Sequence, residues 1–207
     1  MTINLPNQIT IARLLLAIVF FALLAQYSHG ASSPHLLDVC ATIFIVAALT
    51  DILDGYLARK QNQVTSFGRV LDPFVDKLLT IGAFVLLCGQ GFVVGEGDAQ
   101  HNVTDVQAWM VVLILGRELL VPGLRGFSEA QGDEFGANAF GKAKMFVQST
   151  TVPVILFFLA HEDSVLKSPS VVWIKPACVW LTVIVTTLSL VAYLIPARKI
   201  LAETSRP

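Results

Sequence analysis

The chain has 207 residues, of which 55% are hydrophobic and 14% are charged, and its formal net charge is −1 at pH 7. Soluble domains carry roughly 25% charged residues, so this composition excludes an ordinary soluble domain and indicates a membrane protein. The balanced charge is also unlike the strongly basic surface that binds nucleic acid, and no nucleic-acid partner is expected.

Six apolar runs follow one another along the chain, each about as long as a helix that spans a bilayer, roughly 20 residues. They cover residues 9–27, 36–58, 78–94, 106–127, 143–160 and 171–195. Backbone polar groups in lipid must be paired within the protein, so continuous runs of this kind predict helices. We expect an all-α integral membrane protein with six transmembrane helices and one membrane-embedded domain over residues 1–207.

The first apolar run allows two interpretations. A basic residue, Arg13, precedes the apolar stretch of residues 14–25 and small residues follow it. This pattern is typical of a secretory signal peptide as well as of a first transmembrane helix. Removal of the segment would leave five helices in place of six.

The distribution of Lys and Arg predicts the orientation in the membrane. Cytoplasmic loops accumulate these residues, and only Lys167 and Lys175 fall on one side of the predicted spans. The other side carries Arg13, Arg59, Lys60, Arg69, Lys77, Arg117, Arg125, Lys142, Lys144, Arg198, Lys199 and Arg206. Both termini are therefore expected in the cytoplasm. No Arg- and Ser-rich transit segment precedes the first run, which favours a bacterial inner (plasma) membrane.

Four aspartates flank the connection between the second and third runs. Asp51 and Asp54 are three residues apart, and Asp72 and Asp76 are four apart, so each pair shares one face of its helix. A polar stretch between the two pairs lets the helices fold back as an antiparallel hairpin. Because a carboxylate deep in lipid costs on the order of 3 kcal/mol, we expect all four at the cytoplasmic boundary, where they converge.

A cluster of carboxylates predicts a hard divalent cation. Close carboxylates repel one another, and Mg²⁺ or Mn²⁺ relieves this repulsion because these ions prefer oxygen ligands. No His or Cys accompanies the aspartates, which disfavours zinc. Two such ions bridged by carboxylates stabilise the attacking and leaving oxygens of a phosphoryl transfer, so a two-metal site is expected.

The spacing around these aspartates matches a known signature, D-x-x-D-G-x-x-A-R-x8-G-x3-D-x3-D. It resembles that of the CDP-alcohol phosphotransferase family. The eight positions are Asp51, Asp54, Gly55, Ala58, Arg59, Gly68, Asp72 and Asp76. The resemblance implies that a phosphatidyl group moves from a CDP-linked lipid to an alcohol, with release of CMP, at a metal site that opens to the cytoplasm. It also suggests a homodimer.

The resemblance further implies a role for each position. Asp51, Asp54, Asp72 and Asp76 would hold the metals, and Gly55, Ala58, Arg59 and Gly68 would line the cytidine diphosphate pocket. Asp76 would also be the catalytic residue. Whether it accepts the proton of the attacking hydroxyl or forms a covalent intermediate stays open.

Two stretches beside the fourth and fifth runs bear on the acceptor. "GRELLVPGLRGF" holds Arg117 and Arg125, which lie about 80° apart on a helix, and "GKAKMFVQ" holds Lys142 and Lys144. Arg forks and Lys point charges beside an acidic site predict a pocket for a phosphate monoester, although basic residues also flank the inner ends of ordinary membrane helices.

Both stretches resemble the phosphatidylglycerophosphate synthases within the family. The resemblance implies CDP-diacylglycerol and glycerol 3-phosphate as substrates and phosphatidylglycerophosphate and CMP as products. The chain departs from the pattern at Pro122 and Met145, where Ser and Thr are usual. These departures bear on the acceptor and leave the reaction type unchanged.

The amino-terminal "NLPNQITIAR" also resembles the opening of these synthases. The resemblance favours a retained first helix over a cleaved signal peptide, and it implies that Asn7 and Thr10, with Arg13, touch the nucleotide. Alternatives within the family are synthases that use phosphatidylglycerol, inositol phosphate or serine. A distant alternative is an ion-coupled transporter, in which membrane carboxylates relay ions.

Overall fold

The computed structural model describes residues 5–61, 66–130, 139–162 and 171–204, with side chains described for residues 7–51, 71–129, 141–162 and 171–195. This part of the chain contains six α-helices, in agreement with the predicted all-α class. They are α1 (Leu5–Ala25), α2 (His35–Gln61), α3 (Ser66–Leu87), α4 (Ala108–Ala130), α5 (Ala139–Ala160) and α7 (Ile174–Thr204).

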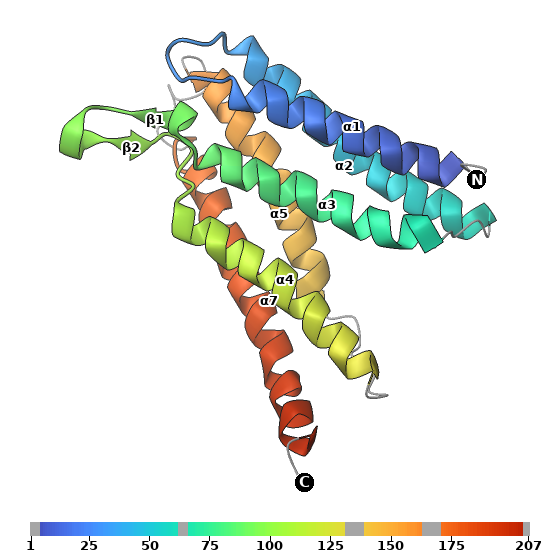
Figure 1. The fold of residues 1–207 in the computed structure, drawn as a ribbon. Coiled ribbons are helices and arrows are strands. Elements are labelled where there is room, and N and C mark those ends of the chain that lie inside the picture. Colours follow the sequence, from blue (N-terminus) through green and yellow to red (C-terminus); the bar gives the residue numbers. More distant parts are fainter. Residues whose placement is uncertain (1–4, 62–65, 131–138, 163–170, 205–207) are drawn as a thin grey trace.

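The helices run back and forth between two ends of the molecule. Helices α1, α2 and α3 lie side by side, and α4 and α7 form a second group that diverges from them (Figure 1). Helix α5 packs against both α2 and α7 and so joins the two groups. The start of α1, the end of α2, the start of α3 and the ends of α4 and α7 lie away from the small hairpin at the other end (Figure 1).

The third predicted run is displaced at both ends. Helix α3 begins at Ser66, twelve residues before that run, because the aspartate-bearing segment continues the helix beyond the apolar residues. It ends at Leu87, since Gly89 adopts an extended conformation before a 3₁₀ turn at Gln90–Phe92. The prediction of a spanning segment up to residue 94 was therefore wrong, and Val93–Val94 forms strand β1 instead.

The segment after α3 is a two-stranded antiparallel hairpin. Strand β1 pairs with β2 (His101–Asn102), with Val93 opposite Asn102. The turn between them contains Gly95 and Gly97 at φ +94° and +57°, a region that favours glycine. The Asn102 amide and the Thr104 hydroxyl both donate to the Leu87 carbonyl, at 3.0 and 2.9 Å, and so cap the end of α3.

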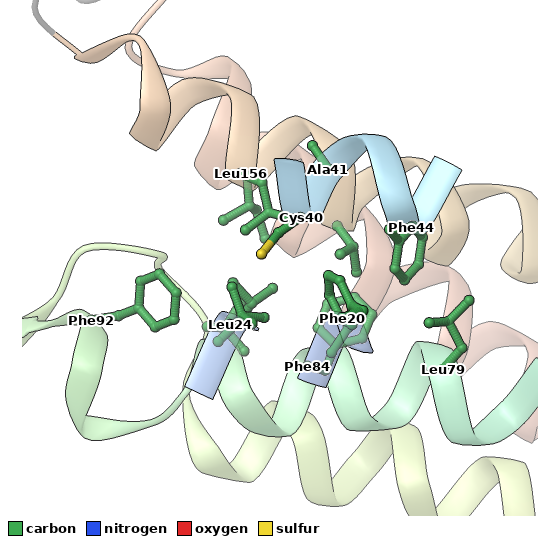
Figure 2. Packing of buried hydrophobic residues seen from close by; sticks show 14 of the residues in the cluster. Phe20, Leu24, Cys40, Ala41, Phe44, Leu79, Phe84, Phe92 and Leu156 are labelled. Atoms are coloured by element: carbon green, nitrogen blue, oxygen red, sulfur yellow. The ribbon is translucent and has the colours of Figure 1, made fainter. Parts of the chain in front are cut away.

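The hydrophobic core lies where α1, α2, α3 and α5 meet. Phe20 of α1 and Phe44 of α2 have ring centroids 5.5 Å apart, and Phe84 of α3 and Leu156 of α5 complete the contact (Figure 2). Cys40 is fully buried in this cluster. The core fixes the relative positions of the helices that carry the aspartates.

The molecule buries polar groups and exposes apolar ones. Leu119, Phe146 and Trp173 are more than 60% exposed, whereas Arg13, Arg117 and Glu118 are at most 5% exposed. A lipid-facing surface explains this distribution, since lipid-exposed side chains are apolar and ionisable residues within membrane proteins face the interior.

Among the described residues, three helical segments are long and apolar enough to cross a membrane: 7–25 in α1, 141–160 in α5 and 174–195 in α7. Helix α4 is continuous, but its apolar sequence contains the charged residues Arg117, Glu118 and Arg125, which lower its mean hydropathy. The six predicted spans thus correspond to six helices, and the crossing of a membrane by α2, α3 and α4 stays a prediction.

Candidate active site

The aspartate pairs lie on α2 and α3, next to the first turns of α1. Asp51 lies on α2, Asp72 lies in the second turn of α3, and Asp76 lies near the middle of α3. The Arg13 Nη1 donates to Asp51 Oδ1 at 2.5 Å, and the Thr10 hydroxyl donates to Asp72 Oδ1, also at 2.5 Å. Helix α1 therefore supplies one positioning contact to a carboxylate on each of the two facing helices.

A cavity of about 580 Å³ opens beside these carboxylates, between α2, α3 and α5. Its polar end contains Arg13, Asp51 and Asp76. Its remaining wall is mostly apolar and includes Phe44, Leu49, Phe146, Pro153 and Val154. Such a cavity matches an amphipathic ligand whose polar group lies at the charged end and whose acyl chain lies along the apolar wall.

The described carboxylates suit a hard cation. Asp51 and Asp76 face the same cavity, and both offer the oxygen ligands that Mg²⁺ and Mn²⁺ prefer. Within the described side chains, no group of three or more acidic, His or Cys residues comes close enough to hold a metal. Asp54 was also predicted as a metal ligand, and its side chain lies outside the described side chains.

A second cavity of about 410 Å³ lies between α3, α4, α5 and α7. Among the described residues that line it, four are cations and two are acidic, which leaves two positive charges in excess. The cations are Lys77, Arg117, Arg125 and Lys142, and the acidic residues are Glu118 and Glu129. An excess of this size matches the charge of a phosphate monoester, about −1.5 to −2 at pH 7.

Glu118 connects the basic residues of this cavity with Lys144, which lies behind it. Its carboxylate contacts the ammonium of Lys144 and lies 3.2 Å from Arg117 Nη1. All three side chains are buried. The Lys77 ammonium donates to the Glu118 backbone carbonyl at 3.1 Å. Lys144 thus lies behind the cavity as a partner of Glu118, and Lys142 lines the cavity itself.

The two cavities adjoin. Lys142 and Met145 of α5 line both of them, while the neighbouring α3 residues Asp76 and Lys77 line one each. A small space of about 10 Å³, lined by both α3 residues and by Glu118 and Lys144, lies between them. A lipid phosphate in the first cavity and a phosphate ester in the second would therefore meet near Asp76.

Several functional candidates were not predicted from the sequence. Lys77 stands one residue after a predicted metal ligand, Ser189 accepts a hydrogen bond from Arg117 Nη2 at 2.8 Å, and the Tyr193 hydroxyl accepts one from Arg125 Nη2 at 3.0 Å. The two α7 residues belong to no motif, so only the packing of α7 against α4 identifies them.

The remaining predicted nucleotide contacts lie at the same end of the bundle. Asn7 is buried in the first turn of α1. Gly55, Ala58 and Arg59 fall in the last turns of α2, and Gly68 falls in the first turn of α3. The contacts of these four residues lie outside the part of the structure for which side chains are described. Their roles stay predictions.

A family model for CDP-alcohol phosphatidyltransferase matches residues 3–192. The chain belongs to the CDP-alcohol phosphatidyltransferase family. The aspartates of α2 and α3 and the basic residues of α4 and α5 lie within the matched range.

Curated relatives in this CDP-alcohol phosphatidyltransferase family carry the name CDP-diacylglycerol–glycerol-3-phosphate 3-phosphatidyltransferase. The Bacillus subtilis protein is 39% identical over 160 residues, which are 74% of this chain and 76% of the relative. The Rickettsia bellii protein is 36% identical over 153 residues, which are 74% of this chain and 75% of the relative. The Haemophilus influenzae protein is 31% identical over 159 residues, 76% and 77%.

Proposed function

We propose that this protein transfers the phosphatidyl group of CDP-diacylglycerol to glycerol 3-phosphate, giving phosphatidylglycerophosphate and CMP in phospholipid biosynthesis. The excess of two positive charges in the cavity beside Asp76 carries the assignment of the acceptor. A neutral alcohol would leave those charges without a counterion in a partly enclosed site, which is costly. The names of the relatives from three bacterial genera support the same acceptor.

The first cavity accounts for the donor lipid. Its apolar wall faces the lipid-exposed surface of α2 and α5, where Leu49 and Phe146 are 55% and 71% exposed. CDP-diacylglycerol can then enter sideways from the bilayer, with its acyl chains along that wall and its pyrophosphate at the cations that Asp51 and Asp76 would help to hold. The predicted nucleotide contacts at the ends of α1, α2 and α3 would hold the cytidine.

Asp76 lies at the junction of the two cavities, where the reacting groups would meet. Its carboxylate accepts the proton of the acceptor hydroxyl as that oxygen attacks the lipid-bearing phosphorus, and CMP leaves with the electron pair of the broken P–O bond. Asp51, Asp54, Asp72 and Asp76 would hold two Mg²⁺ or Mn²⁺ ions, which stabilise charge on the phosphate oxygens when bound. Arg117 and Arg125 orient the acceptor through its phosphate.

The predicted placement in the cell completes the proposal. The protein is a multi-pass protein of a bacterial inner membrane, acts as a homodimer, and has its active site on the cytoplasmic side. Support comes from the described basic side chains of Arg13, Lys77, Arg117, Arg125, Lys142 and Lys144, which lie at the end of the bundle that holds the aspartates. At the other end, Lys175 is paired with Asp105 at 3.1 Å, so its charge is offset.

The test is CMP release by the purified protein from CDP-diacylglycerol with Mg²⁺ or Mn²⁺. Glycerol 3-phosphate is compared with glycerol, inositol phosphate, serine and phosphatidylglycerol, and Asp76→Asn serves as the inactive control. We expect release with glycerol 3-phosphate alone and its loss in the variant. Release with phosphatidylglycerol or serine in its place would contradict the assigned acceptor, and release by Asp76→Asn at the wild-type rate would contradict the role of Asp76.

A further inference from the structure

Tyr193 of α7 stands in an unusual position between the two arginines of the second cavity. The Arg117 and Arg125 guanidinium carbons lie 5.7 and 5.9 Å from the centroid of its ring. The tyrosine itself is 5% exposed and lines the cavity. Helices α4 and α7 lie side by side here (Figure 1).

This convergence needs a physical cause. Eight residues separate the two arginines, which corresponds to a rise of about 12 Å along α4, yet both guanidinium groups reach the same ring. Two guanidinium groups beside one ring carry like charges and repel each other, and this repulsion is stronger away from water. The negative face of an aromatic ring attracts a cation, so Tyr193 offsets part of this repulsion in the absence of an anion.

Helix α7 also fixes each arginine by a hydrogen bond. Arg117 Nη2 donates to Ser189, and Arg125 Nη2 donates to the Tyr193 hydroxyl, one helical turn further along α7. The Nε–H groups of both arginines are buried and make no hydrogen bond within the described part of the chain. The hydrogen bonds from α7 thus hold both side chains in place.

We propose that Tyr193 is a positioning residue for the acceptor phosphate, which holds Arg117 and Arg125 at one point before the phosphate binds. The inference rests on the proposed function, since it assigns the residue that prepares the acceptor pocket. A pre-positioned pair of guanidinium groups loses less conformational entropy on binding. Tyr193 therefore affects the affinity for a phosphate monoester and leaves the donor lipid site unchanged.

The test compares Tyr193→Phe and Tyr193→Leu with the wild type and with Tyr27→Phe. Tyr27 is also 5% exposed but lies at the opposite end of the bundle, where its hydroxyl is 3.3 Å from His29 Nδ1. We expect Tyr193→Phe to raise the KM for glycerol 3-phosphate about tenfold or more, as for one lost hydrogen bond to a charged group. Tyr193→Leu should raise it further because the ring is also lost. The KM for CDP-diacylglycerol and the kcat should stay within about twofold of the wild type.

A second readout does not depend on turnover. Glycerol 3-phosphate should raise the unfolding temperature of the wild type and of Tyr27→Phe, and the shift should be smaller for Tyr193→Phe at the same concentration. If the wild type is inactive but shows these shifts, the proposed reaction fails and the role of Tyr193 stands. An unchanged KM and an unchanged shift in both Tyr193 variants, or equal effects of Tyr27→Phe, would overturn the inference.

Discussion

At the scale of single residues, the buried ionic group around Glu118 decides how the basic cavity is held. One carboxylate contacts two buried cations, Arg117 and Lys144. Removal of one member of such a group leaves uncompensated charge in a low-dielectric interior, which costs more than the interaction itself contributes. The residue is therefore structural for the site, and it need not touch the acceptor.

Substitution of Glu118 tests this. Glu118→Gln keeps the shape of the side chain and removes its charge, so we expect a loss of about 3–5 kcal/mol in the free energy of unfolding. The double variant Glu118→Gln, Lys144→Met removes one cation as well and should recover part of that loss. Thermal unfolding in detergent measures both variants. Equal unfolding temperatures for the wild type and the single variant would show that the buried pair contributes little.

Thr10 tests the support of the predicted metal site. Its hydroxyl donates to Asp72, and groups that orient metal ligands typically change metal affinity 10–100-fold when they are removed. We expect Thr10→Val to raise the Mn²⁺ concentration for half-maximal activity about tenfold or more. Thr42→Val is the matched control, because the exposed Thr42 hydroxyl donates only to the carbonyl of Asp38 in its own helix. The same metal dependence in both variants would argue against a role for Thr10.

The sequence predicted some residues of the site and missed others. The aspartates and Arg117 and Arg125 belong to spaced motifs, because metal and phosphate chemistry require particular side chains at particular helical intervals. Ser189 and Tyr193 belong to none, since a hydroxyl that supports an arginine can come from any helix that packs nearby. Such contacts depend on how α7 lies against α4, and no periodicity in either helix specifies that.

At the scale of elements, the end of α3 and the hairpin after it show where hydropathy fails. The apolar residues Phe92, Val93 and Val94 continue the run, but α3 ends at Leu87, before the extended Gly89. The predicted start of α3 was too late in the sequence, because helical turns that contain charged residues extend α3 beyond its apolar part. Within the described residues, one α-helix corresponds to each of the six predicted apolar runs, in the predicted order, since each run has about the 20 apolar residues that a spanning helix needs.

Gly91 tests the docking of this segment against the end of α1. A Cβ at this position would collide with the backbone carbonyl oxygen of Tyr27, while a Cβ at Gly123 in α4 would have no neighbour within 4 Å. We expect Gly91→Ala to destabilise the protein by about 1–3 kcal/mol. Gly123→Ala should leave stability unchanged or raise it by up to about 1 kcal/mol. Thermal unfolding of the two variants compares them, and equal shifts would contradict the close approach.

At the scale of the whole molecule, the polar interior and the apolar surface meet at one end of the bundle. The site needs water-soluble glycerol 3-phosphate and a lipid at the same point, and the described cavities offer one polar and one apolar compartment that adjoin. This arrangement places the reaction at the membrane boundary, where both substrates can arrive.

The orientation in the membrane can be tested with two exposed residues at opposite ends. Glu96 lies in the hairpin turn and Glu129 near the end of α4. With the three native cysteines replaced, we expect Glu96→Cys to react with a membrane-impermeant maleimide added outside spheroplasts. Glu129→Cys should react only after permeabilisation. The reverse pattern would place the active site outside the cytoplasm and contradict the positive-inside assignment.

The central claim is that the basic cavity selects a phosphate-bearing acceptor for phosphatidyl transfer. The most direct measurement is the ratio of kcat/KM for glycerol 3-phosphate to that for glycerol, in the wild type and in Arg125→Gln. We predict a wild-type preference on the order of a thousandfold or more, which falls at least about tenfold in the variant through loss of activity with glycerol 3-phosphate alone. A wild type that uses both acceptors equally, or a variant that loses activity with both to the same extent, would contradict the account.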